Sequence, residues 1–76
     1  MWIEICKIKV SAKQLKKLDK HKVEEHRKSF EEGEYVMPID VVKINESEYC
    51  INGNGRHRFF GAVEAGISMI EANVVN

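Results

Sequence analysis

Four turn-forming residues follow one another at Asn52-Gly53-Asn54-Gly55, and this run constrains the fold more than any other part of the sequence. Glycine adopts positive φ angles freely and asparagine tolerates them, so neither a strand nor a helix is expected to continue through the run. The preceding residues Tyr49-Cys50-Ile51 are typical of a strand, and the apolar residues within 59–63 recur at helical spacing. The sequence therefore predicts a strand, a tight turn and a helix, in that order.

The remaining segments predict short elements of both kinds. We expect a strand over 2–10, two helical stretches within 11–33, a strand over 38–44 that forms a hairpin with 49–51, and a last strand over 69–75. The first of these strands alternates cleanly only from Cys6 onward, which indicates a bulge or two-sided burial at its start. The predicted order is β-α-α-β-β-α-β, an α+β fold with a small mixed β-sheet.

Local signals mark the helix boundaries. Ser11 and Gln14 have the spacing of a capping box, in which each side chain satisfies a free amide of the other residue. Residues 19–22 contain no apolar side chain, so a break between the two helical stretches is expected there. Gly33 and Gly66 are placed to end helices in a left-handed conformation.

Length and composition favour one folded domain that spans residues 1–76, with 43% hydrophobic residues. No apolar run approaches the roughly 18 residues of a membrane span, and no cleavable signal segment is evident, so we expect a cytoplasmic protein without a membrane partner. The cysteines form no pattern of a disulfide scaffold or a zinc site, so no metal site is predicted. The side chains expected in the core are Trp2, Phe30, Phe59 and Phe60, together with Cys6 and Cys50 as buried, unreactive thiols.

The charge is balanced overall but divided along the chain. Residues 1–30 carry nine lysine or arginine residues and four acidic ones, for a net charge of +5, whereas residues 31–76 carry three and eight, for −5. The basic residues within 7–28 could attract nucleic acid or a protein partner, or could simply keep one helix face solvated. A chain this small would also gain stability as a homodimer.

The turn at 52–55 and the start of the following helix together predict an anion site. Glycines let the backbone approach a ligand closely, and the first amides of a helix are free and favour negative charge. Basic side chains at that helix end oppose the dipole, so their presence indicates binding rather than stability. The candidate phosphate-binding residues are Gly53, Asn54, Gly55, Arg56, His57 and Arg58; His57 is also a candidate general acid, without an evident base.

The segment Gly55-Arg56-His57-Arg58-Phe59-Phe60-Gly61-Ala62-Val63-Glu64-Ala65-Gly66 resembles the signature of the ParB/sulfiredoxin family, in which a Gly-x-His/Arg-Arg turn opens a helix. Upstream, Pro38-Ile39-Asp40-Val41 is similar to the Pro-Ile-x-Val segment of that family. The resemblance covers residues 2–75. It implies a nucleotide such as CTP or ATP, with Mg²⁺, whose phosphates the matching residues Gly55, His57 and Arg58 would hold.

Departures from the family pattern narrow the function and leave alternatives open. Arg56 stands where the catalytic cysteine of sulfiredoxins lies, so sulfiredoxin chemistry is not expected. The helix-turn-helix region of partition proteins has no match, so centromere binding is not expected either. The first hypothesis is nucleotide binding with phosphoryl transfer or nucleotide hydrolysis; the second is a non-enzymatic interaction module for nucleic acid or protein. A third, a ParB-like nuclease, would need a carboxylate metal site, for which Glu31, Glu32 and Glu34 are the weak candidates against a plain solvated helix end.

Overall fold

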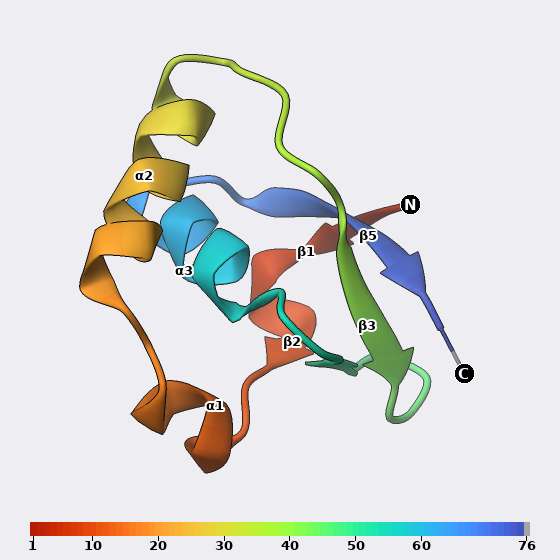
Figure 1. Ribbon diagram of the computed structural model, residues 1–76. Coiled ribbons are helices and arrows are strands. Elements are labelled where there is room, and N and C mark those ends of the chain that lie inside the picture. Colours follow the sequence, from red (N-terminus) through yellow and green to blue (C-terminus); the bar gives the residue numbers. More distant parts are fainter. Residues whose placement is uncertain (76) are drawn as a thin grey trace.

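The computed structural model describes residues 1–75, which form a mixed sheet and three α-helices (Figure 1). The elements, in chain order, are β1 (Trp2–Glu4), the 3₁₀ helix η1 (Ile5–Lys7), β2 (Ile8–Lys9), α1 (Ala12–Lys16), α2 (Lys20–Glu31), β3 (Ile39–Lys43), β4 (Tyr49–Ile51), α3 (Arg56–Glu64) and β5 (Met69–Val74). The predicted α+β class and the strand–turn–helix unit at 49–64 are confirmed. The difference lies at the N-terminus, where the single strand predicted over 2–10 is divided in two.

The sheet has the strand order β1-β5-β3-β4-β2. β1 and β3 pair with β5, antiparallel and parallel respectively, while β4 pairs antiparallel with β3 and parallel with β2. β1 and β2 therefore lie on opposite edges, although only the three residues of η1 separate them in the chain. The sheet must curl to bring both edges to this short segment. The 3₁₀ helix η1 also explains why apolar and polar residues do not alternate regularly over residues 2–10. The inward-facing residue is Ile3 before η1 and Ile8 after it, and both are buried.

The core lies between the inner face of the sheet and α3. Ile39, Val41 and Ala72 are completely buried on β3 and β5, and Phe59 and Ala62 cover them from α3. Burying each isoleucine, valine or phenylalanine of this set contributes about 1.5–3 kcal/mol relative to leaving it exposed.

Two glycines set the close approach of α3 to its neighbours. A methyl group at Gly55 would lie 2.9 Å from Ile39 Cβ, and one at Gly61 would lie 2.6 Å from His26 Cβ. Both distances are shorter than carbon–carbon contact allows, so α3 packs against β3 at its start and against α2 at its middle only because these side chains are absent.

The helix boundaries follow the local signals, with one correction. The capping box at Ser11 and Gln14 is formed, and Gly33 and Gly66 adopt positive φ angles of 71° and 74°. The break predicted over 19–22 was placed too late, because the Asp19 side chain accepts a hydrogen bond from the His21 amide at 2.9 Å and so begins α2.

Two predictions of burial are wrong. Trp2 is 63% exposed, because Ile3 takes the inward position of this short strand and its neighbours face outward. Cys6 is exposed as well, since it lies on η1 rather than on a continuous strand, whereas Cys50 is half-buried. No helix within residues 1–75 is long and apolar enough to cross a lipid bilayer.

Candidate anion site at the start of α3

The first turn of α3 presents backbone amides without a capping side chain. Its N-cap residue is Gly55, which has no side chain to accept a hydrogen bond from these amides. Within residues 1–75, no loop or side-chain acceptor bonds the amides of Arg56, His57 or Arg58. These free donors lie at the positive end of the helix dipole, where an anion is stabilised by typically 0.3–1 kcal/mol even at an exposed site.

The loop before α3 is held in place from two sides. The Asn52 amide donates to the Asp40 carbonyl at 2.9 Å, and the Gln14 side chain of α1 donates to the Ile51 carbonyl at 3.1 Å. Gly53 has a φ of 77°, which an L side chain adopts only with strain. The loop therefore presents Asn54 and the α3 amides from a braced position.

The two arginines extend from the first turn of α3 to different sides. Arg58 Nη1 donates to the carbonyl oxygens of Met37 at 3.0 Å and Pro38 at 2.8 Å, in the segment before β3. Arg56 Nη2 lies 3.4 Å from the Lys17 carbonyl at the end of α1, while its Nε is buried and has no acceptor among the described residues. Neither guanidinium forms an ion pair with a carboxylate of residues 1–75. Both positive charges are therefore uncompensated by acidic groups of that part of the chain.

His57 is held by α2. It is only 8% exposed, and its Nε2 accepts a hydrogen bond of 2.9 Å from the Asp19 amide, 38 residues earlier in the chain. Burial, followed by the positive charges of Arg56 and Lys22, lowers the pKa of His57 below its usual value. At neutral pH the ring is therefore uncharged, and because Nε2 accepts, the proton lies on Nδ1.

The N-terminal ends of α2 and α3 lie together. Asp19, the N-cap of α2, contacts His57 in the first turn of α3, and further along both helices His26 packs against Gly61. The two helices thus run side by side with their positive dipole ends on the same side of the molecule (Figure 1). Lys22 in the first turn of α2 adds a further positive charge near His57.

The candidate carboxylates of the sequence are not gathered into a metal site. Glu31 forms an ion pair with Arg27 at 2.6 Å, and Glu32 and Glu34 are exposed near the end of α2. Among residues 1–75, no group of three or more histidine, cysteine, aspartate or glutamate side chains is arranged to hold a metal ion.

Gly53, Asn54 and Gly55 form the loop before α3, and Arg56, His57 and Arg58 form its first turn. The structure also adds partners that no sequence pattern indicated: Asp19 for His57, Lys17 for Arg56, and the carbonyls of residues 37 and 38 for Arg58. Contacts between residues so far apart in the chain leave no recognisable pattern in the local sequence. Capping by Asp19 was the one detectable element, since aspartate is a favoured N-cap residue.

The family model for the ParB N-terminal domain matches residues 2–76 of the sequence. The chain belongs to the ParB N-terminal domain family. No curated protein sequence matches it.

Solved structures share the fold of this ParB N-terminal domain. A sulfiredoxin from Arabidopsis thaliana superposes with a TM-score of 0.81 at 21% identity, over the whole chain and 83% of the sulfiredoxin. A free serine kinase in complex with ADP gives 0.78 at 23%, and a C-terminally truncated chromosome-partitioning protein ParB from Caulobacter crescentus complexed with CTP-gamma-S gives 0.75 at 20%. The chain spans only 30% of the kinase chain and 44% of the ParB chain. At these identities the similarity establishes the fold.

Proposed function

We propose that this ParB N-terminal domain binds the phosphate groups of a nucleotide at the first turn of α3. The observation that carries the proposal is the pairing of an uncapped helix start with two guanidinium groups that no carboxylate of residues 1–75 neutralises. Two structures of the same fold contain nucleotides, ADP in the kinase and CTP-gamma-S in ParB, which supports this ligand class.

In this proposal the backbone of Gly53, Asn54 and Gly55 surrounds one phosphate group, and the α3 amides donate to its oxygens. Arg58 leaves the carbonyls of the segment before β3 and binds phosphate oxygens instead, because a charged acceptor is the stronger partner. Arg56 has a buried Nε without an acceptor and gains one. His57, uncharged at neutral pH, contributes an Nδ1–H donor rather than a charge.

Magnesium would enter this site with the nucleotide. The described residues contain no ready cluster of acidic ligands, so phosphate oxygens and water would provide most of the coordination. Any phosphoryl transfer or hydrolysis would then depend on positioning and charge neutralisation by the two arginines. The general-acid role suggested by the sequence does not suit His57, because its lowered pKa leaves the ring without an acidic proton at neutral pH.

Calorimetric titration with CTP, ATP and ADP, with and without Mg²⁺, tests the proposal. We expect one nucleotide to bind with a micromolar dissociation constant, and Arg58→Ala and Arg56→Ala each to weaken that binding at least tenfold. Lys28→Ala removes an exposed positive charge from the far end of α2 and should leave the affinity unchanged. The proposal fails if the folded protein binds none of the three nucleotides, or if the arginine variants bind as well as Lys28→Ala.

A second candidate function is non-enzymatic binding of a polyanion such as nucleic acid. It is favoured by one observation: the lysines of α1 and of the start of α2 are exposed and border Arg56, which contacts the Lys17 carbonyl. Affinity for duplex DNA that falls steeply between 50 and about 200 mM salt would support this function. Mononucleotide binding that is lost in Arg58→Ala would favour the first function instead.

A further inference from the structure

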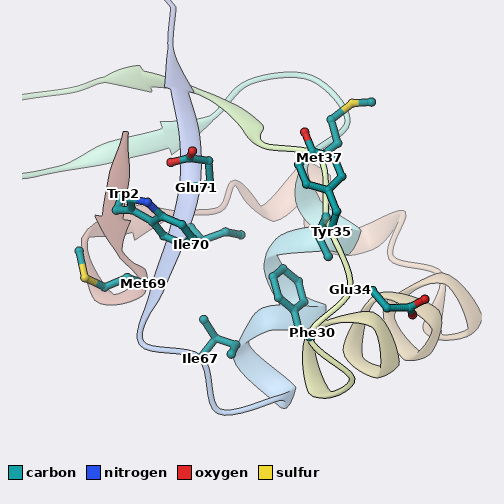
Figure 2. Close-up of a pocket in the computed structure, with 11 residues that line it drawn as sticks. Trp2, Phe30, Glu34, Tyr35, Met37, Ile67, Met69, Ile70 and Glu71 are labelled. Carbon is teal, nitrogen blue, oxygen red and sulfur yellow. The ribbon is translucent and has the colours of Figure 1, made fainter.

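A groove lies between the strap, defined as residues 33–38 joining α2 to β3, and the strands β1 and β5 (Figure 2). It has a volume of about 310 Å³. Its floor is apolar and consists of Phe30, Ile67 and Ile70. None of the residues of the proposed nucleotide site, Gly53 to Arg58, lines it.

Both walls of the groove expose large apolar side chains. Tyr35 and Met37 on the strap are 83% and 65% exposed, and Trp2 and Met69 on the strands are 63% and 40% exposed. A small monomer rarely leaves so many large apolar side chains in water around one hollow, and such a cluster usually marks a surface that another molecule covers. Aromatic residues and methionine are also the types enriched at protein interfaces.

The charged side chains that line the groove are both carboxylates, Glu34 and Glu71. Two positive groups lie beside it: the Met1 ammonium near Glu71, and Arg58, which donates to the Met37 carbonyl of the strap. The only charged side chains of β1, β5 and the strap are Glu4, Glu71 and Glu34. The strand register sets Glu71 opposite Trp2 and Glu4 opposite Met69, so carboxylates and apolar side chains alternate on this wall. Glu71 Oε2 is buried without a hydrogen-bond partner among the described residues, with the Met1 ammonium 3.5 Å away. The surface therefore favours an occupant with positive charge beside apolar groups.

One backbone edge also faces the groove. β5 pairs with β1 from Met69 onward, but its pairing with β3 begins only at Ala72, because the strap diverges from it before that point. The β3 side of residues 69–71 thus has no neighbouring strand within residues 1–75. An extended peptide could bond to such an edge while its alternate side chains enter the groove.

We propose that this groove docks an extended segment of a partner protein that carries a bulky apolar side chain flanked by lysine or arginine. The apolar side chain enters the space above Phe30 and Ile70, and the flanking cations approach Glu71 and Glu34. Trp2 and Tyr35 can stack on the same cations. A second copy of the chain fits the surface less well, because a symmetric contact would bring the same carboxylates face to face.

The test is titration of the ¹⁵N-labelled protein with three defined peptides, followed by amide chemical shifts. The basic probe is acetyl-Arg-Trp-Leu-Arg-amide, and the others replace both arginines by serine or by glutamate. We expect saturable shifts of residues 33–37 and 69–71 with the basic probe and about tenfold weaker binding of the acidic one. Equal binding of the acidic and basic probes, or no saturable shifts in these segments, would overturn the proposal.

Matched variants locate the contact. Tyr35→Ser removes an exposed aromatic from the strap, and Ile44→Ser removes an apolar side chain, 54% exposed, from the β3–β4 turn outside the groove. Glu71→Gln and Glu46→Gln form the corresponding pair for charge. Only the two groove variants, Tyr35→Ser and Glu71→Gln, should lower the affinity for the basic probe, each by several-fold. Shifts at 33–37 and 69–71 that depend on protein concentration without peptide would show that a second copy occupies the groove, and would contradict the proposed occupant.

Discussion

The contact between Gly55 and the sheet allows a quantitative prediction for Gly55→Ala. The backbone angles of Gly55, φ −80° and ψ −6°, are allowed for alanine, so the substitution introduces no conformational strain. The new methyl group, however, would meet Ile39 Cβ at 2.9 Å, Ile39 Cγ2 at 3.0 Å and Ile51 Cγ2 at 3.3 Å. Because Ile39 and Ile51 are buried, neither can move freely into solvent.

Overpacking of this kind destabilises a protein by typically 1–3 kcal/mol, and alanine is also a poorer N-cap than glycine. We therefore expect Gly55→Ala to lower the free energy of unfolding by about 2 kcal/mol, which corresponds to a fall in Tm of roughly 8–16 °C for a domain of this size. Calorimetry and urea denaturation measure both quantities. Binding at the proposed nucleotide site should weaken as well, since displacement of the first turn of α3 moves its amides.

A double-mutant cycle checks the cause of this loss. Ile39→Ala alone should cost about 2–5 kcal/mol, but its cost should be smaller by about 1 kcal/mol in the Gly55→Ala background, where the shortened side chain relieves the clash. Ile70→Ala, in a buried position that the new methyl group does not meet, should show no such coupling. Unchanged stability of Gly55→Ala, or strict additivity with Ile39→Ala, would refute the explanation.

Three further predictions concern other contacts of the fold. Gly61→Ala should lower the free energy of unfolding by about 1–3 kcal/mol, because the new methyl group meets α2 at His26. This loss outweighs the better helix propensity of alanine. A variant as stable as the unchanged protein in urea denaturation would refute this close packing. Because the pKa of His57 is lowered in the folded state, the unfolded state binds more protons below pH 6.5. The contribution of His57 to stability should therefore be constant above that pH and decrease as the pH falls toward the folded pKa. Urea titrations at pH 5–8 should show a smaller loss of stability in His57→Gln than in the unchanged protein, and an equal loss in both would contradict the explanation. Ser11→Ala removes the capping box and should cost about 1 kcal/mol in thermal denaturation, whereas Ser11→Asp should retain most of the stability.

The sequence predicted the elements that local chemistry determines. Ser11 with Gln14, the positive φ angle of Gly33 and the turn before α3 all rest on interactions within a few residues, and each was confirmed. Division of the first strand was not predictable in detail, since it depends on which strands end up at the two edges of the sheet.

The same distinction applies to the candidate site: features within a few residues could be predicted, and contacts between distant segments could not. The grouping of residues 53–58 follows from their adjacency in sequence, and their role in binding phosphate stays a prediction. The hydrogen bond between His57 and the Asp19 amide joins segments with no shared pattern. The groove was also missed, because Tyr35 and Met37 lie in a segment without helical or strand periodicity.

Placement of β1 and β2 on opposite edges has a consequence for how the chain folds. The register joins Trp2 to Glu71, so one edge forms only when segments from the two ends of the sequence meet. Contacts of such high sequence separation require a large loss of chain entropy before they give any stabilisation, and they slow folding. We therefore expect this edge to assemble late, after the local β3–β4 hairpin. Until then β5 is an unprotected edge strand, so partly folded molecules should be the species most prone to aggregate.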